Sequence, residues 1–532
     1  MNTAHTTGTS ANHATISTQD LEAMLDDDKE LALFDVREAG QFGESHLLDA
    51  TPLPYSRLEL DIGALVPRRS VRIVLCDDGA SGVADLAARR LTALGYSDVS
   101  VLQGGTKAWA AEGHPLFAGV NVPSKAFGEW VEHSCHTPRV TARELADRVA
   151  AGENLVILDG RPYAEYHKFS IPGGICCPNG ELAYRFTTLV PNPKTKVVVN
   201  CAGRTRSIIG AETLIRLGVP NPVCALENGT QGWFLADLAV ERGATRRYPE
   251  RIEPERLPAL RAAARRLAER FAIPTVAADD VRQWLGDSTR TTYLCDVRTA
   301  EEFSAGSLPG AVHAPGGQLI QATDQWIGVR RSRIVLIDGE GVRAPVVATW
   351  LKQMGWDVCV LAKGVRAQLK GTERFRSPLP ELAVISAAEL KPALDGGRCL
   401  VFDLDPGMAF RRAHIPGSRW SIRPRLAADA LGATQGIVLV ADDPEIARLA
   451  AVDLREAGHR DVRMLEGGLA AWSRAGHAAA SSPDAPADAE CIDYLFFVHD
   501  RHMGNKEAAQ QYLSWEIGLL NQLEPRDRKR FR

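Results

Sequence analysis

Residues 196 to 218 read KVVVNCAGRTRSIIGAETLIRLG, a stretch that changes its structural period within a few residues. It begins with a β-branched run typical of a buried parallel strand and ends with the apolar spacing of a helix that stops at Gly218. Between the two stand Cys201 and a short loop with one glycine and two arginines. The stretch therefore predicts a strand, a tight loop and a helix, the unit from which α/β domains are built.

The same strand and helix recur three more times, in VRIVLC then DLAARRLTALGY, in RIVLI then VVATWLKQMGW, and in GIVLV then IARLAAVDLREAGH. Each copy is preceded by an apolar strand that ends in aspartate (LALFDVR, LVILDGR, TYLCDVR, CLVFDLD) and by a turn such as IPGG. Each is followed by a short strand and a glycine-initiated segment such as LENGTQGW, in which Trp109, Trp233 and Trp472 are expected to pack in the core. This repetition predicts four tandem α/β domains, each with a mainly parallel sheet flanked by helices on both faces.

The repeats divide the chain into domains and connecting segments. The four domains are expected at residues 14–120, 125–245, 275–378 and 379–480. The Arg- and Glu-rich residues 246–274 predict a solvated linker helix. Residues 490–525 predict a C-terminal docking strand, over the apolar run 494–498, and a docking helix. His499 and His502 are three residues apart but lack a third ligand, so no metal site is expected.

The composition is that of ordinary globular domains, with 45% hydrophobic residues, 24% charged residues and a net charge of -4. This balance indicates neither a nucleic-acid partner nor a membrane partner. The N-terminus is polar and no run approaches the ~18 apolar residues of a membrane span, so a cytoplasmic protein is expected. The ten cysteines are too sparse for a disulfide framework, and free thiols are the default.

Chemistry is expected at the loop after the second repeat's central strand, where parallel sheets carry their functional residues. There the thiol of Cys201 faces backbone N–H groups, a helix N-terminus and the guanidinium groups of Arg204 and Arg206, which predicts a lowered thiol pKa. Gly203 allows the tight turn, and the two arginines suit the oxygens of an anionic donor. The remaining loop residues are Ala202, Thr205 and Ser207.

Together the DxR motif, the IPGG turn, the CAGRTRS loop and the ending L-x-x-G-x-x-x-W resemble the rhodanese homology domain, and all four repeats show this resemblance. It implies a sulfurtransferase without a cofactor. Cys201 would take sulfur from thiosulfate or a similar donor as a persulfide and pass it to cyanide, glutathione or a protein thiol. Within this family the charged Arg204 and Arg206 favour thiosulfate over mercaptopyruvate. The resemblance also implies that Asp159 orients the loop and that Arg161 braces it.

Two other functions remain open. The same fold includes phosphatases, which need C-x5-R, but here the sixth residue after Cys201 is Ser207 and the arginine comes one position earlier, at Arg206. This shorter loop suits a sulfur atom better than a phosphate. The alternative from another class is a sulfur-relay scaffold whose degenerate repeats bind a partner protein.

The other repeats are expected to be inactive. Cys76 is aligned with Cys201, but Asp77 and Asp78 beside it would raise its pKa and repel an anionic donor. The third repeat has Ile337 at this place, and the fourth has Val440 or Ala441, depending on the alignment. In related two-domain sulfurtransferases an inactive copy packs against an active one, which implies that repeats one and two form one pair and repeats three and four another.

Several further residues are candidates for secondary roles around Cys201. Cys176 and Cys177 are adjacent on a strand, so at most one of them faces the pocket, and burial is the expected role of both. Lower-grade candidates for the pocket rim are Tyr163, Glu165, His167 and Arg185.

Overall fold

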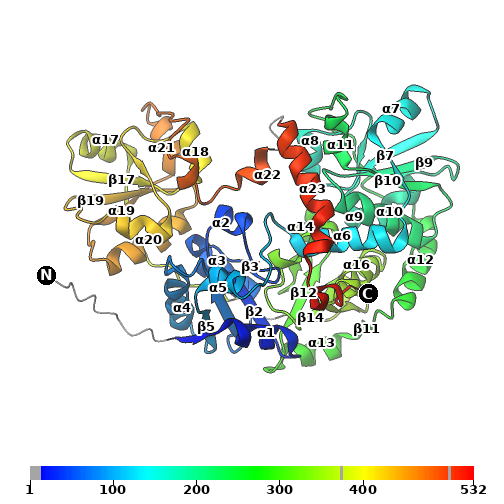
Figure 1. The fold of residues 1–532 in the computed structure, drawn as a ribbon, viewed down its shortest axis with the longest axis horizontal. Coiled ribbons are helices and arrows are strands. Elements are labelled where there is room, and N and C mark those ends of the chain that lie inside the picture. The colour runs from blue at the N-terminus through cyan, green and yellow to red at the C-terminus, as the bar shows by residue number, and fades with distance from the viewer. Residues whose placement is uncertain (1–12, 372–374, 501–504, 532) are drawn as a thin grey trace. The chain divides into compact units, whose positions relative to one another are not determined.

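The computed structural model describes residues 13–371, 375–500 and 505–531, and it contains four sheets of five parallel strands with flanking helices (Figure 1). This confirms the predicted α/β class and the four repeats. In repeat two the strand order across the sheet is β6(Arg139–Val140), β10(Val223–Leu226), β9(Lys196–Asn200), β7(Leu155–Asp159), β8(Ile175–Cys176).

The other three sheets have the equivalent order. Repeat one has β1(Ala14–Ile16), β5(Val99–Leu102), β4(Arg72–Cys76), β2(Leu31–Asp35) and β3(Thr51–Pro52). Repeat three has β11(Thr275–Val276), β15(Asp357–Leu361), β14(Arg333–Ile337), β12(Thr292–Asp296) and β13(Val312–His313). Repeat four has β16(Ala383–Ile385), β20(Val462–Leu465), β19(Gly436–Val440), β17(Cys399–Asp403) and β18(Arg419–Trp420).

Helices connect these strands in each repeat. Repeat one has α1(Thr18–Asp26), α2(Ala39–Glu44), α3(Leu58–Leu65), α4(Val83–Ala93) and α5(Gly105–Ala111), and repeat two has α7(Ala142–Ala150), α8(Tyr163–Lys168), α9(Asn179–Leu189), α10(Thr205–Leu217) and α11(Gly229–Leu235). Repeat three has α13(Ala278–Leu285), α14(Ala300–Ala305), α15(Gly316–Gln321) and α16(Arg343–Gln353), and repeat four has α17(Ala387–Asp395), α18(Gly407–Arg412), α19(Arg423–Asp429), α20(Pro444–Glu456) and α21(Gly468–Arg474). The glycines predicted to end α4, α10, α16 and α20 all have the positive φ that this position favours.

The sheet of repeat two is buried on both faces, which explains its β-branched central strand. Val197 and Val199 of β9 pack with Leu182 in the core on one face. Val198 points to the other face, where Trp233 lies in a second cluster. The predicted packing role of the recurring tryptophans is thus confirmed, and Trp109 and Trp472 are also buried.

The repeats do not pair in the expected way. One compact unit comprises Met1–Asp27, Ala32–Gly119 and Phe375–Phe496, and the other comprises Asp28–Leu31, Val120–Arg374 and Phe497–Arg532. The first therefore combines repeats one and four, and the second combines repeats two and three. The prediction that neighbours pair as one with two and three with four was wrong. Pairing depends on which helix surfaces fit together, and distance along the chain does not reveal it.

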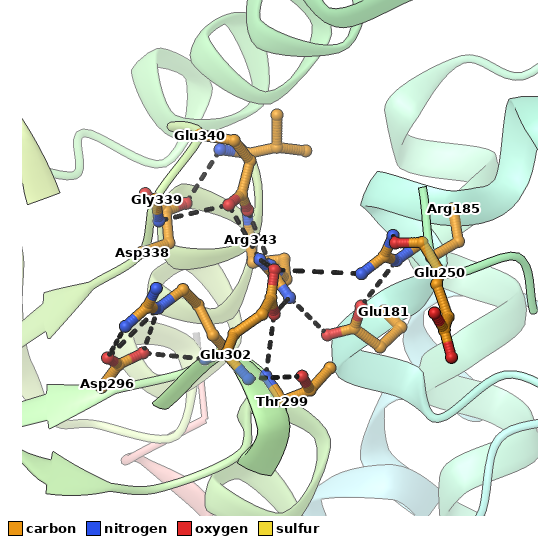
Figure 2. A network of polar contacts seen from close by, with 12 residues as sticks. Glu181, Arg185, Glu250, Asp296, Thr299, Glu302, Asp338, Gly339, Glu340 and Arg343 are labelled. Carbon is orange, nitrogen blue, oxygen red and sulfur yellow. Dashed lines mark hydrogen bonds and ion pairs between the residues drawn. The ribbon is translucent and has the colours of Figure 1, made fainter. Parts of the chain in front are cut away.

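In the second unit, repeats two and three meet along α9 and α15, where the backbones approach closely. A Cβ on Gly180 would lie 2.6 Å from the backbone nitrogen of Gly317, so this contact excludes a side chain. Beside it, Arg343 of α16 is fully buried and binds three carboxylates (Figure 2). Its guanidinium lies 2.8 Å from Glu181 of repeat two, 2.6 Å from Glu302 and 2.7 Å from Glu340.

An equivalent contact joins repeats one and four in the first unit. The buried Arg423 of α19 donates to both carboxylate oxygens of Glu59 on α3, at 2.5 and 2.8 Å. It also donates to Asp453 of α20 at 2.9 Å. Within each unit, a buried arginine thus lies between the two repeats and pairs with carboxylates from both of them.

Three segments outside the repeats differ from the expected picture. The linker helix is present as α12(Leu257–Arg270), but its Leu260, Ala264 and Leu267 are buried against repeats two and three, so it is not simply solvated. The apolar run at 494–498 is not a strand, because helix α22(Phe496–Asp500) begins within it. The predicted C-terminal helix is present as α23(Lys506–Gln522), and a short helix α24(Pro525–Arg528) follows.

A helix that the sequence did not predict, α6(Val122–Cys135), precedes the first strand of repeat two. Gly128 of α6 lies against the start of α10, where a Cβ on this glycine would be 2.8 Å from the side chain of Thr205. Helix α23 packs along α6 in the same unit (Figure 1). Two segments outside the repeat pattern thus reach the loop that follows β9.

The described residues contain neither a membrane-spanning helix nor a cluster of metal ligands. None of their helices is long and apolar enough to cross a membrane. No group of three His, Cys, Asp or Glu among them could hold a metal ion. His502 lies outside the described residues.

The buried Asp403 of repeat four predicts a pH-dependent stability. Repeat four lacks the DxR arginine, and burial, with Asp405 nearby, raises the pKa of Asp403 to about 7. The unfolded chain has the lower, ordinary pKa, so between pH 4 and 7 the folded state binds more protons and its stability falls as the pH rises. We expect β17 to lose about 3 kcal/mol of protection between pH 5 and 8.

Hydrogen exchange of the β17 peptide at several pH values measures this effect. In Asp403→Asn the dependence should largely vanish, and Asp405→Arg, which restores the missing partner, should weaken it. Equal dependence in all three proteins would contradict the assignment to Asp403.

Candidate active site in repeat two

Cys201 is buried directly after β9, in a loop whose backbone is hydrogen-bonded to the first turn of α11. Its backbone oxygen accepts a hydrogen bond from the N–H of Thr230 at 2.8 Å, and the oxygen of Ala202 accepts one from the N–H of Gln231 at 3.0 Å. The hydroxyl of Ser207, in the first turn of α10, donates to the Cys201 sulfur at 3.1 Å. The loop is therefore held rigidly with its sulfur facing the N-terminus of α10.

The pKa of Cys201 does not follow the expected direction. Burial raises it above its ordinary value, although Arg206 and hydrogen bonds from the hydroxyl and backbone N–H of Ser207 lower it. The carboxylate of Glu516, on the C-terminal helix α23, raises it further. The cations of the loop could be recognised from the sequence. The burial of Cys201 and the nearby carboxylate of Glu516, which raise its pKa, could not.

Both loop arginines are paired with glutamates. Arg204 donates to both oxygens of Glu129 on α6, at 2.7 and 2.8 Å, and also binds Glu132. Arg206 donates to both oxygens of Glu165 on α8, at 2.8 Å each. Their predicted contact with an anionic donor stays a prediction, and each guanidinium already pairs with a carboxylate.

The Asp159–Arg161 pair forms the base of the site. Arg161 is fully buried, and its guanidinium donates to Asp159 at 2.6 and 2.9 Å and to the backbone oxygen of Phe169 at 2.8 Å. Asp159 also accepts a hydrogen bond from Asn200, the residue before Cys201, at 3.1 Å. Asp159 thus contacts the residue next to Cys201, and the orienting role of Asp159 and the bracing role of Arg161 stay predictions.

The other candidates around the loop separate into different surroundings. Cys177 lies in the core next to α9, whereas Cys176 lies in a separate cluster where burial raises its pKa to about 12. Arg185 binds Glu181 in the contact between repeats and does not reach the loop. His167 contacts the backbone of Ala244, Tyr163 is partly exposed, and Glu165 alone among the rim candidates binds a loop residue.

The strand register corrects the alignment of the other repeats. Asp159 pairs with Asn200 across the sheet, Asp296 pairs with Ile337, and Asp403 pairs with Val440. Ile337 and Val440 therefore match Asn200, and the positions that match Cys201 are Asp338 and Ala441. In repeat one the N–H of Val36, the residue after Asp35, donates to the backbone oxygen of Cys76. In repeat two the N–H of Gly160, the residue after Asp159, donates to the backbone oxygen of Asn200, so Cys76 also matches Asn200.

The residue that matches Cys201 in repeat one is thus Asp77, and the expectation that Cys76 occupies this place was wrong. The carboxylate of Asp77 accepts hydrogen bonds from the N–H groups of Gly79 and Ala84, at 2.7 and 3.1 Å. Asp338 of repeat three accepts three such bonds, at 2.9 to 3.0 Å. In both repeats the loop N–H groups hold an anion that the chain itself supplies.

Sequence reasoning missed Glu129, Glu132 and Glu516. They lie on α6 and α23, outside the repeated pattern, so no motif connected them to the loop. The only signal was the amphipathic spacing of KEAAQQYLSWEIGLLNQL, which predicted that this helix docks but not where.

Gly229, at the start of α11, is expected to be essential to the loop geometry. Its φ is +55°, and a Cβ there would lie 2.3 Å from the backbone oxygen of Cys201. We expect Gly229→Ala to displace the loop and to slow sulfur uptake about 100-fold, because small misplacements of reacting atoms have such effects. The matched control is Gly218→Ala, since Gly218 also has a positive φ but nothing within 4 Å of its Cβ position. Unchanged uptake by Gly229→Ala would contradict this view of the loop.

Comparison with known proteins places the chain in a family. The rhodanese-like domain model matches residues 17–112, 141–236, 277–369 and 386–475, which together cover well over half of the chain. The chain belongs to the rhodanese family, with four domains of that type.

One solved structure matches almost the whole chain. It is described as a thiosulfate sulfurtransferase from Pseudomonas aeruginosa, is 42% identical, and superposes with a TM-score of 0.90 over 97% of this chain and 99% of that one. Curated relatives match only one domain. They include an HTH-type transcriptional regulator (34% identity, 20% of this chain, 45% of the relative) and a probable adenylyltransferase/sulfurtransferase, MoeZ (33%, 20% and 26%), both of Mycobacterium tuberculosis. The chain thus spans less than half the length of these curated relatives.

Proposed function

We propose that this chain is a sulfurtransferase with one working site, in which Cys201 carries sulfur as a persulfide. One observation carries the proposal. At the position where repeats one and three hold a carboxylate with loop N–H groups, repeat two has the thiol of Cys201. The loop architecture is therefore suited to a negatively charged atom at this place. The thiosulfate sulfurtransferase to which the chain is similar over nearly its whole length supports the same reaction class.

The reaction balances as two displacements at sulfur. The Cys201 thiolate attacks the outer sulfur of thiosulfate, the sulfur–sulfur bond of the donor breaks, and its electron pair leaves with sulfite. The anionic persulfide then lies where Asp77 and Asp338 place their carboxylates, so the N–H of Ser207 and the charge of Arg206 stabilise it. An acceptor such as cyanide, glutathione or a protein thiolate attacks the outer sulfur and regenerates the Cys201 thiolate.

Mass spectrometry of the full chain tests this proposal. After incubation with thiosulfate we expect the intact mass to increase by one sulfur atom and peptide mapping to place that sulfur on Cys201. The increase should disappear after addition of cyanide, with formation of thiocyanate. No added sulfur with thiosulfate or mercaptopyruvate would refute the proposal.

A sulfur-relay scaffold is the second candidate, favoured by the absence of a cysteine at the Cys201 position in the three other repeats. It requires a specific protein partner. Capture of nothing specific by the full chain, together with full turnover of small acceptors, would count against it. The phosphatase alternative predicts hydrolysis of p-nitrophenyl phosphate, which we do not expect from the short loop.

A further inference from the structure

The C-terminal helix α23 reaches the loop of Cys201 and lies against Gly203. A Cβ built on Gly203 would lie 2.9 Å from a carboxylate oxygen of Glu516 and 3.8 Å from the ring of Tyr512. The other oxygen of Glu516 accepts a hydrogen bond from the hydroxyl of Thr205 at 2.9 Å. Glu516 is only 2% exposed, so its carboxylate is enclosed at the loop surface.

The position of α23 is fixed by several contacts in the part of the helix that precedes Glu516. Lys125 of α6 lies over the rings of Tyr512 and Trp515, with its nitrogen 5.0 and 4.7 Å from their centroids. At the beginning of the helix, Lys506 forms an ion pair with Asp237 of repeat two. The placement of Glu516 therefore does not depend on a single contact.

The charges around the loop do not make it cationic. The loop itself carries two positive groups, Arg204 and Arg206, and four carboxylates surround them, Glu129, Glu132, Glu165 and Glu516. The first three form ion pairs with these arginines. Arg139 also lies 3.5 Å from Glu132. Glu516 forms no ion pair within the described part of the chain, and the oxygen that faces Gly203 has no hydrogen-bond partner there. Of the four carboxylates it is the one that no cation pairs directly, and Arg204 acts on it only through its longer-range charge.

We propose that Glu516 selects sulfur donors by charge at the Cys201 site, disfavouring a dianion such as thiosulfate relative to a donor with one negative charge. This inference rests on the proposed function. The charge already acts on the thiol, since it shifts the Cys201 pKa. A donor in contact with Cys201 lies inside the same enclosed loop, where solvent screens the repulsion weakly.

The test compares donors of different charge. In Glu516→Gln, which keeps the shape and the hydrogen bond to Thr205, we expect kcat/KM to rise about tenfold for thiosulfate and about threefold for 3-mercaptopyruvate, because the same charge acts on twice as much donor charge. The ratio of the two values then shifts about threefold toward thiosulfate. Glu507→Gln, on the exposed beginning of α23, is the matched control and should change neither value.

A second variant separates charge from packing. Glu516→Asp keeps the charge and shortens the side chain, so the donor ratio should stay close to that of the unmodified protein. An unchanged ratio in Glu516→Gln, or an equal shift in both variants, would overturn the selecting role while leaving the persulfide reaction intact. Absence of persulfide from either donor, with and without the substitution, would overturn the proposed function and this inference together.

Discussion

Replacing Cys201 by serine is expected to abolish sulfur uptake and thiocyanate formation, because a hydroxyl at this position cannot form a persulfide. The effect should be complete, since no other repeat has a cysteine at the matching position. Intact mass after thiosulfate treatment and an assay of thiocyanate provide the two measurements. The control is Cys76→Ser, which changes a cysteine that ends a strand and should leave turnover unchanged.

A companion variant tests the reason given for the site. Cys201→Asp copies the residue that repeats one and three use, so its carboxylate should be held by the loop N–H groups. We expect it to be inactive but folded, with a thermal midpoint close to that of Cys201→Ser. Marked destabilisation by Cys201→Asp would show that the loop of repeat two cannot bind a carboxylate as the loops of repeats one and three do. Persulfide on the Cys201→Ser protein would refute the assignment of the nucleophile.

Replacing Arg343 by methionine is expected to have the largest effect on stability. The side chain is fully buried, and its removal leaves Glu340 enclosed without an ion-pair partner among the described residues, while Glu181 keeps only Arg185. Breaking a buried ion pair in this way destabilises a protein by about 3–5 kcal/mol. Part of the network is visible in the pKa of Glu302, which burial raises but Arg343 lowers more strongly, to about 2.

Calorimetric unfolding of the full chain measures this loss. Arg282→Met is the control, since Arg282 forms an exposed ion pair with Asp279 and should contribute less than about 1 kcal/mol. Adding Glu340→Gln to Arg343→Met should recover part of the loss, because the charge that lost its ion-pair partner is then removed. A transition unchanged by Arg343→Met would contradict the role of this contact in joining repeats two and three.

The sequence predicted the fold because its signals are local. Apolar strands that end in aspartate and helices that end in glycine occur in each repeat, and both faces of each sheet are buried, so periodicity revealed every domain. Alignment of the loops was less secure. Strand β4 ends at Cys76 itself, whereas β9 ends at Asn200, one residue before Cys201. Only the hydrogen bonds between strands show that Cys76 matches Asn200.

Long-range features escaped sequence reasoning for a physical reason. The pKa of Cys201 depends in part on Glu516 of α23, and Arg204 pairs with carboxylates of α6, yet nothing local connects these two helices to the loop. Arg204 and Arg206 were recognised as cations, but Glu129 and Glu165, which neutralise them, lie 75 and 41 residues away along the chain. Charge in a folded site is a property of the assembled surroundings and not of the motif.

In the chain, repeats two and three of one compact unit lie between repeats one and four of the other, and this order has a consequence for synthesis on the ribosome. Repeat one emerges first, yet its partner surface belongs to repeat four, which is translated roughly tens of seconds later at ordinary elongation rates. Repeats two and three can dock while the chain is still growing. The nascent first repeat meanwhile exposes the face around Glu59 that Arg423 later covers, which makes it the part of the polypeptide most exposed to chaperones before translation ends.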